Sequence, residues 1–504
     1  MDLPKVMRSK PFLAIVVALV IVAIAVLAAS WGDSNGGDGD GDDDGTDPPL
    51  VPPYVLDDQG FNHPVQDAFQ GSNEPHIAVN PLNPMNMVAG SNDYSSPKSD
   101  AWVGYYWTFD GGKRWEQNLI PGYPSGPVSA LTGFEAAGDP VIAAGPDGEF
   151  YYAGIAFKRS IPAAGRASSI FVAKSTDGGR TFGQVSMVAQ SLTQGTFHDK
   201  EWIAVDNSEG PGRGNIYCVW AMFQPYGSQM VFSKSEDGGR TWTRPPRVLS
   251  DILGLEFQLQ GAQIVVDNDG AIHITWIDFD GMQHRYVRST DQGDSFSDPA
   301  DVGAVTEIPY ELPNGGYRTP TLPALAVDNT GGPFDGSLYL TWNDYRNGTA
   351  DVLMIGSHDG GNTWSQAVLV NDDGEDSAAD QFFPSITVAG NGTVCISFYD
   401  RRDDPDNTLL MIYHTQSVDG GETFLDNIPV TDVQFDGNAA GGRKKGGVFT
   451  GTPFMGDYTG SASSDGFIIS IWCDTRNGTP DTPNSDTYVV RVTIAPLADS
   501  VPAS

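Results

Sequence analysis

Cysteine and basic residues are scarce in this chain of 504 residues, and each shortage argues against a class of protein. The three cysteines, Cys218, Cys395 and Cys473, are too few and too scattered for a disulfide framework or a zinc site, so we expect small buried side chains. There are 28 lysines and arginines against 64 aspartates and glutamates, a formal net charge of -36. A field of this sign repels polyanions, and we expect no nucleic-acid partner.

Histidine is also scarce, with seven copies and no spacing of the H-x-x-x-H kind. This pattern disfavours a metal-dependent hydrolase, so we predict neither a metal site nor a cofactor. Calcium stays open as a ligand, because aspartate and backbone oxygens bind it without a fixed motif.

Long apolar runs are missing apart from residues 12–29, which carry no charge and would span about 27 Å as a helix. Lys5, Arg8 and Lys10 precede this run, and basic residues tend to stay on the cytoplasmic side. We interpret residues 1–31 as a basic flank and a signal anchor, a transmembrane helix that crosses the cell membrane once and places the rest outside. Cleavage after the small residues that follow would instead give a secreted protein.

Three further segments follow the predicted anchor. Residues 32–53 are rich in Gly and Asp and read as a self-repelling acidic linker. Residues 54–497 hold nearly all of the aromatic residues, with many Gly and Pro, which is typical of short strands and tight turns. Residues 498–504 read as a tail.

One turn motif occurs six times, as TFDGGKRW, STDGGRTF, SEDGGRTW, STDQGDSF, SHDGGNTW and SVDGGETF. Its aspartate can accept hydrogen bonds from the backbone of its own turn, its glycines permit positive φ, and its last aromatic can pack between sheets. Each copy therefore predicts a hairpin fastener. The six aspartates are Asp110, Asp177, Asp237, Asp291, Asp359 and Asp419.

A second repeat, an apolar strand closed by a turn, lies upstream of each motif. Its anchor residues are spaced by 65, 61, 61, 61, 61 and 74 residues and are Ile77, Ile142, Ile203, Ile264, Leu325, Ile386 and Gly460. Seven units of about four strands predict an all-β, seven-bladed β-propeller, which hides its sheet edges by closing on itself. The last unit has room for only three strands, so we expect residues 54–69 to supply its fourth.

The six turns resemble the Asp boxes of the sialidase-like propeller family, also called BNR repeats, over about residues 70–495. The resemblance implies a propeller and an exo-α-sialidase-like glycoside hydrolase, with an arginine triad for the substrate carboxylate, a Tyr nucleophile paired with Glu, and an Asp acid/base. Propellers of that family have six blades, whereas this chain counts seven units. The string nearest to the arginine motif of the family is YRTP, with Arg318.

Arginines recur in three turns that join the second and third strands of the last three units. These turns read WNDYRNG, FYDRRDDPD and WCDTRNG, and they contain Arg346, Arg402 and Arg476. Together with Arg318 these arginines could bind a carboxylate or sulfate bidentately. The alternative is that each Asp pairs with its own Arg and fastens the turn.

The linkers that enter the innermost strands of the units are rich in polar residues, and in a propeller they surround the mouth of the central channel. They contain Glu74, Asp139, His198, Asp199, Lys200, Glu201, Gln260, Arg318, Gln381, Asp457 and Tyr458. Asp199 and Glu201 are candidates for the catalytic acid and base, and Tyr458 for a nucleophile. The alternative is that such residues cap backbone amides of the next blade.

Three N-G-T sequons, at Asn347, Asn391 and Asn477, predict glycosylation if the chain is exported. The leading hypothesis is a monomeric, membrane-tethered, sialidase-like propeller that binds or hydrolyses an extracellular, acidic glycan. The rival is a non-catalytic scaffold for another surface protein.

Overall fold

The computed structural model describes residues 63–65, 71–95, 101–159, 168–191, 195–225, 227–250, 258–374, 377–441, 443–445, 448–464 and 466–496. The predicted signal anchor, the acidic linker and the tail lie outside these residues. Within these ranges, no helix is long and apolar enough to cross a membrane.

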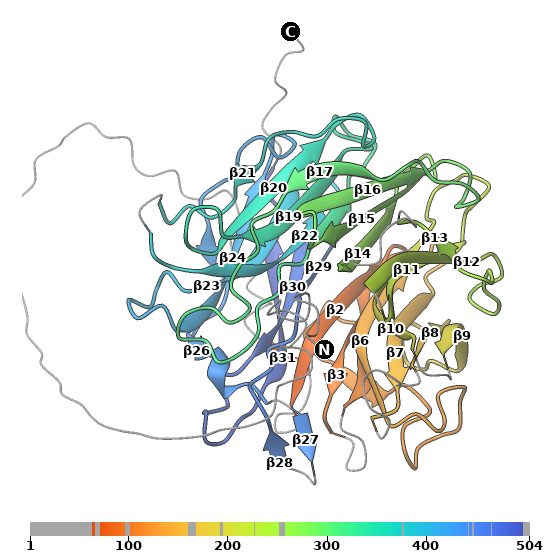
Figure 1. Ribbon diagram of the computed structural model, residues 1–504, viewed down its shortest axis with the longest axis horizontal. Coiled ribbons are helices and arrows are strands. Elements are labelled where there is room, and N and C mark those ends of the chain that lie inside the picture. Colours follow the sequence, from red (N-terminus) through yellow and green to blue (C-terminus); the bar gives the residue numbers. More distant parts are fainter. Residues whose placement is uncertain are drawn as a thin grey trace, which may run out of the picture. The chain divides into compact units, whose positions relative to one another are not determined.

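Seven antiparallel sheets, six of four strands and one of five, follow one another along the chain and form the predicted seven-bladed propeller (Figure 1). Blade one holds β2 (Ser72–Asn80), β3 (Asn83–Asp93), β4 (Trp102–Thr108) and β5 (Glu116–Leu119). Blade two holds β6 (Ala136–Ala144), β7 (Phe150–Phe157), β8 (Ser168–Ser175) and β9 (Gln184–Ser191). Blade three holds β10 (Phe197–Val205), β11 (Ile216–Gln224), β12 (Gly227–Ser235) and β13 (Arg247–Val248).

The remaining blades repeat this order. Blade four holds β14 (Leu259–Val266), β15 (Ile272–Asp278), β16 (Gln283–Ser289) and β17 (Ala300–Ala304). Blade five holds β18 (Ala324–Val327), β19 (Leu338–Asp344), β20 (Asp351–Ser357) and β21 (Val368–Leu369). Blade six holds β22 (Gln381–Val388), β23 (Val394–Asp400), β24 (Leu409–Ser417) and β25 (Ile428–Pro429), with β26 (Phe435–Asp436) also paired to β24. A separate hairpin joins β27 (Arg443–Lys445) and β28 (Val448–Thr450).

Blade seven joins the two ends of the ring. Its strands are β29 (Gly460–Ser463), β30 (Phe467–Asp474), β31 (Asp486–Thr493) and β1 (His63–Pro64). Strand β1 pairs antiparallel with β31, and the backbone N–H of Ser72 donates to the carbonyl of Ser485 at 2.7 Å. The prediction that residues 54–69 supply the missing strand is therefore confirmed. Figure 1 shows β2 of the first blade beside β30 and β31 of the last.

The core lies between the blades, because each sheet packs on both of its neighbours. Every residue of β7, FYYAGIAF, is buried, as expected for a strand that is covered on both faces. The second strands of four blades also carry a fully buried tryptophan, Trp220, Trp276, Trp342 and Trp472. Aromatic side chains of this size contribute the largest apolar areas to a core. The three cysteines are free and buried, as predicted.

The six aspartate turns have one hydrogen-bond pattern. In each turn, one carboxylate oxygen accepts from the hydroxyl two residues earlier and from the backbone N–H four residues later, at 2.7–3.0 Å. In blade four, the hydroxyl and the N–H of Ser295 lower the pKa of Asp291 to about 2. Each turn is therefore fastened by an ionised carboxylate.

Candidate functional site

The inner strands of five blades contain a β-bulge close to their first residue. The bulged residue has a positive φ in each blade, at Glu74 (52°), Asp139 (58°), Lys200 (50°), Gly261 (64°) and Phe383 (51°). Four of these are not glycine, and an L-residue rarely adopts such a backbone. A bulge redirects its side chain relative to the pleat. The repeat therefore places a bulge at the same point in five of the inner strands.

These residues share one position in the repeat, three residues before its anchor. The same count gives Leu322 in blade five and Asp457 in blade seven. We call the seven residues the bulge ring. Its polar arc, from blades seven, one, two and three, is Asp457, Glu74, Asp139 and Lys200. Its apolar arc, from blades four, five and six, is Gly261, Leu322 and Phe383.

Lys200 holds the polar arc together. Its Nζ lies 2.8 Å from Glu74 Oε1, 3.4 Å from Asp139 Oδ2 and 2.6 Å from Asp457 Oδ2. Arg318 adds a bidentate pair to Asp457, with Nε and Nη2 at 2.6 and 2.5 Å from its two oxygens. The polar arc thus links four blades through one lysine, and its charges are nearly all buried.

Arg318 reaches this network from the long segment between β17 and β18. Arg401, which is fully buried, holds that segment in place. Its Nη1 donates to the carbonyl of Pro313 and its Nη2 to the hydroxyl of Tyr317, both at 2.8 Å. Because Tyr317 directly precedes Arg318, Arg401 positions the arginine of the channel mouth.

The carboxyl groups at the mouth differ in their affinity for protons. Burial raises the pKa of Glu74 to about 8 despite the nearby Lys200, and burial also raises the pKa of Asp139 and Asp199. Arg318 and Lys200 outweigh the effect of burial at Asp457 and lower its pKa. Asp457 is therefore the firmly ionised member of the group.

Glu201 follows Lys200 in β10 and is the most isolated acid of the mouth. The residue is 1% exposed, and neither carboxylate oxygen has a hydrogen-bond partner on another residue. Burial, and next the charge of Asp139, raise its pKa well above the usual value. Asp199, in contrast, accepts a hydrogen bond from Gln260 at 3.0 Å. The two predicted acid/base residues therefore lie in different surroundings.

Tyr458 lies between these acids and the aromatic residues of the mouth. Its hydroxyl donates to the backbone carbonyl of Pro140 at 3.0 Å, and its ring meets that of Trp202 edge to face at 5.8 Å. Burial raises the pKa of this phenol well above its usual value. A nucleophilic phenol needs a base to take its proton, and here that proton faces an amide carbonyl.

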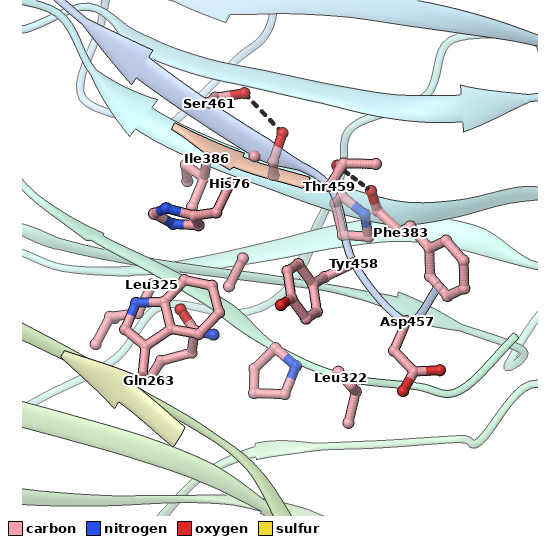
Figure 2. A pocket seen from close by; sticks show the side chains of 16 residues that line it. His76, Gln263, Leu322, Leu325, Phe383, Ile386, Asp457, Tyr458, Thr459 and Ser461 are labelled. Carbon is pink, nitrogen blue, oxygen red and sulfur yellow. Dashed lines mark hydrogen bonds between the residues drawn. The ribbon is translucent and has the colours of Figure 1, made fainter. Parts of the chain in front are cut away.

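Two neighbouring cavities open among these residues. The larger, of about 160 Å³, is lined by His76, Trp202, Asp457 and Tyr458 together with apolar residues that include Leu322, Pro323, Leu325, Phe383 and Ile386. Figure 2 shows His76 and Tyr458 pointing toward the same space, with Asp457 at its edge. The smaller cavity, of about 30 Å³, is lined by Asp139, Lys200, Glu201, Trp202, Gly261, Ala262, Gln263, Leu322, Pro323 and Tyr458.

The other predicted arginines lie in the turns between second and third strands, and each binds the aspartate of its own turn. Arg346 Nε lies 2.7 Å from Asp344, Arg402 Nε 2.8 Å from Asp400, and Arg476 Nη2 2.7 Å from Asp474. Arg402 and Arg476 also contact a second aspartate, Asp372 and Asp432 respectively. The structure thus has the second of the two arrangements considered from the sequence, in which each Asp pairs with the Arg of its own turn. An anion could bind these arginines only by competing with aspartates already in place.

His198 and Gln381, two other polar linker residues, have structural partners. His198 Nδ1 accepts from the indole of Trp220 at 2.9 Å, and Gln381 donates to Asp373 at 3.0 Å. The sequence reading missed His76, Trp202 and Gln263, which line the larger cavity. All three stand directly before an anchor of the repeat, so the spacing could have identified them.

The predictions on metal binding and glycosylation concern residues on the same blades. Within the described ranges, no three His, Cys, Asp or Glu side chains are grouped so that they could hold a metal ion. Asn347 and Asn477 are exposed next to the rim arginines, and Asn391 is partly buried at the end of a turn in blade six. Glycosylation of these residues stays a prediction.

Among known proteins, the chain is similar only to proteins found by comparison of three-dimensional structures. No model of a protein family matches the chain, and no curated protein does. A protein of unknown function from Dyadobacter fermentans is 14% identical over 69% of this chain and 95% of its own, with a TM-score of 0.46. A Hadza microbial sialidase is 15% identical over 67% and 65%, with a TM-score of 0.43. A leech intramolecular trans-sialidase is 13% identical over 85% and 68%, with a TM-score of 0.40.

Proposed function

We propose that the propeller binds one sugar unit of an extracellular glycan at the channel mouth. The observation that carries this proposal is the division of the bulge ring into a polar and an apolar arc, with a cavity of about 160 Å³ beside them. Binding pockets combine apolar walls with a few polar groups that fix the ligand's orientation. An empty space of about 150 Å³ admits a benzene-sized molecule, so a six-membered ring is the right scale.

The charges favour a neutral or cationic sugar over the acidic glycan expected from the sequence. Arg318, Arg346, Arg402 and Arg476 all contact aspartates. The net charge of -36 adds a field that opposes an acidic ligand. Hydroxyl groups of a sugar, in contrast, can donate to the carboxylates of the polar arc while the ring contacts Trp202 and the apolar arc.

Hydrolysis is a second candidate, favoured by the opposite pKa shifts of Glu201 and Asp457. Glycosidases use a protonated carboxylic acid together with an ionised carboxylate. In this proposal Glu201 donates the proton to the leaving group and Asp457 stays ionised. Tyr458 serves better as a wall of the site than as a nucleophile, because its proton faces the Pro140 carbonyl.

Export and tethering complete the proposal. The apolar run at residues 12–29 would hold the protein in the cell membrane, and the Gly- and Asp-rich linker would separate the propeller from the lipid surface. A sugar-binding mouth then faces the exterior.

The test is a binding and hydrolysis panel on the full-length chain. Calorimetry would measure binding of neutral, acidic and amino monosaccharides, and sugar release would be measured on matching glycosides. Trp202→Leu removes an aromatic wall and should weaken binding at least tenfold. Phe109→Leu, an aromatic change in an aspartate turn at the opposite end of the blades, is the matched control. Absence of binding to every sugar would favour the surface-protein scaffold.

A further inference from the structure

Glu201 is buried at a position where the repeat does not need an acid. The equivalent residue, two before the anchor, is proline in four blades, Pro75, Pro140, Pro323 and Pro384. It is Ala262 in blade four and Tyr458 in blade seven. A buried carboxyl without a hydrogen-bond partner destabilises a fold. Because most blades do without one, the acid in blade three is more readily explained by a ligand than by the architecture.

The small cavity beside Glu201 has the size of a single polar group. Its volume of about 30 Å³ exceeds the roughly 10–15 Å³ that one water needs. Aromatic residues Trp202 and Tyr458 form part of its wall, and both also line the larger cavity, together with Gln263, Leu322 and Pro323. One ligand can therefore place a ring in the larger cavity and a small substituent toward Glu201.

The charges around the small cavity select a cation as that substituent. Five carboxyl groups at the mouth, those of Glu74, Asp139, Asp199, Glu201 and Asp457, lie near only two basic side chains, Lys200 and Arg318. Burial raises the pKa of Glu74 and Glu201, so each can give up a proton when a cation enters. A metal ion would need three or more grouped ligands, and the described part of the chain offers no such group. An ammonium group needs fewer fixed ligands and is also attracted to aromatic faces.

We propose that the channel mouth binds a sugar that carries a primary ammonium group, and that the carboxylate of Glu201 accepts a hydrogen bond from this group. The inference rests on the proposed binding of a sugar unit and gives its chemical class, an amino sugar. The ring lies in the larger cavity, and the ammonium group replaces the partner that Glu201 lacks.

Proton release should accompany this binding. Burial raises the pKa of Glu201, so the empty site holds a proton that an ammonium ion would displace. The groups that face Glu201 are Asp139, Asp199, Lys200, Tyr152, Tyr458 and Cys218. Lys200 keeps its charge, and burial holds the two tyrosines and the cysteine neutral. Glu201 is therefore the expected source of the proton, with Asp139 and Asp199 contributing.

The experiment compares D-glucosamine, N-acetylglucosamine and D-glucose on the full-length protein. We expect D-glucosamine to bind at least tenfold more tightly than the other two. Glu201→Gln should reduce that preference to less than threefold, whereas Glu307→Gln, which changes a glutamate outside both cavities, should leave it unchanged. Calorimetry of the unaltered protein in buffers of different ionisation enthalpy should show proton release with D-glucosamine and none with D-glucose. This second measurement does not depend on the folding of a variant.

Each other outcome overturns a defined part of the proposal. Equal binding of all three sugars would overturn the ammonium preference and leave sugar binding standing. A preference that persists in folded Glu201→Gln, or binding of D-glucosamine without proton release, would overturn the role of Glu201. Absence of binding to any of the three would overturn this inference, and absence of binding to every sugar of the wider panel would overturn the proposed function as well.

Discussion

The polar and apolar arcs of the bulge ring occupy the same position in the repeat but are stabilised in different ways. Blades seven, one, two and three supply Asp457, Glu74, Asp139 and Lys200, which form a buried ionic network. Blades four, five and six supply Gly261, Leu322 and Phe383, which contribute contact surface. The repeat thus fixes where a side chain is placed and leaves its chemistry free. An asymmetric site can arise on a nearly symmetric ring.

Lys200→Met is the change that should break the polar arc most severely. Removing one partner of a buried ion pair costs about 3–5 kcal/mol, because the remaining charges stay buried. The loss should be smaller at pH 5 than at pH 8, since Glu74, whose pKa burial raises to about 8, is protonated at pH 5 and leaves no unpaired charge. Chemical denaturation at both pH values measures it. Lys113→Met, at an exposed lysine in an aspartate turn, is the control. It should lower the free energy of unfolding by less than about 0.5 kcal/mol, as surface substitutions usually do.

Phe383→Ala tests the apolar arc in the same way. Removing a buried phenylalanine side chain costs about 3 kcal/mol through lost contacts and a cavity. Because no charge is involved, the loss should be the same at pH 5 and pH 8. A pH dependence like that of Lys200→Met would show that the two arcs do not behave as separate halves.

Glu201→Gln, next to the polar arc, should sharpen the comparison by stabilising the folded protein at high pH. A carboxyl whose pKa is raised in the folded state keeps its proton where the unfolded chain has lost it, so stability falls as pH rises above its ordinary value of 4.5. The glutamine variant lacks this loss. It should exceed the parent by about 1–3 kcal/mol at pH 9 and differ little at pH 5. Parallel stability curves across this range would contradict the buried, protonated state of Glu201.

Arg346→Ala should have the smallest effect, because the rim pairs are partly solvated. The side chain of Arg346 is 36% exposed, and such pairs contribute about 0–1 kcal/mol. The affinity for each sugar of the panel should be the same in Arg346→Ala and in Arg476→Ala as in the unaltered protein. Loss of sugar binding with an unchanged melting temperature would instead support the hypothesis that these arginines bind the ligand.

Much of the architecture was predictable because the repeat is visible in the sequence. The anchor spacing gave the seven blades, and the short last unit gave the closing strand from before blade one. The linkers pointed to the acids of the mouth. The sequence did not show that five inner strands bulge at one position, because Glu74, Lys200 and Phe383 are not residues that favour positive φ. Tertiary packing imposes that backbone.

Partners of charged residues were the part that sequence could not decide. The sequence places Asp344 and Arg346 in one turn, but the same sequence fits an arginine that is free to bind an anion and an arginine that is paired with its aspartate. Arg318 finds Asp457 139 residues away in sequence, which no local pattern indicates. The lack of a partner at Glu201 is also a property of three-dimensional packing alone.

The pairing of β1 with β31 determines how the ring responds to mechanical force. A pull on the chain before residue 63 acts first on the antiparallel pairing of His63 and Pro64 with Val489 and Tyr488. This strand is two residues long, so it can peel away from the sheet one pair at a time. The inner three strands of blade seven and the sheets of the other six blades keep their own hydrogen bonds. For a propeller held at its amino terminus, the closing strand would therefore be the first part to yield under load.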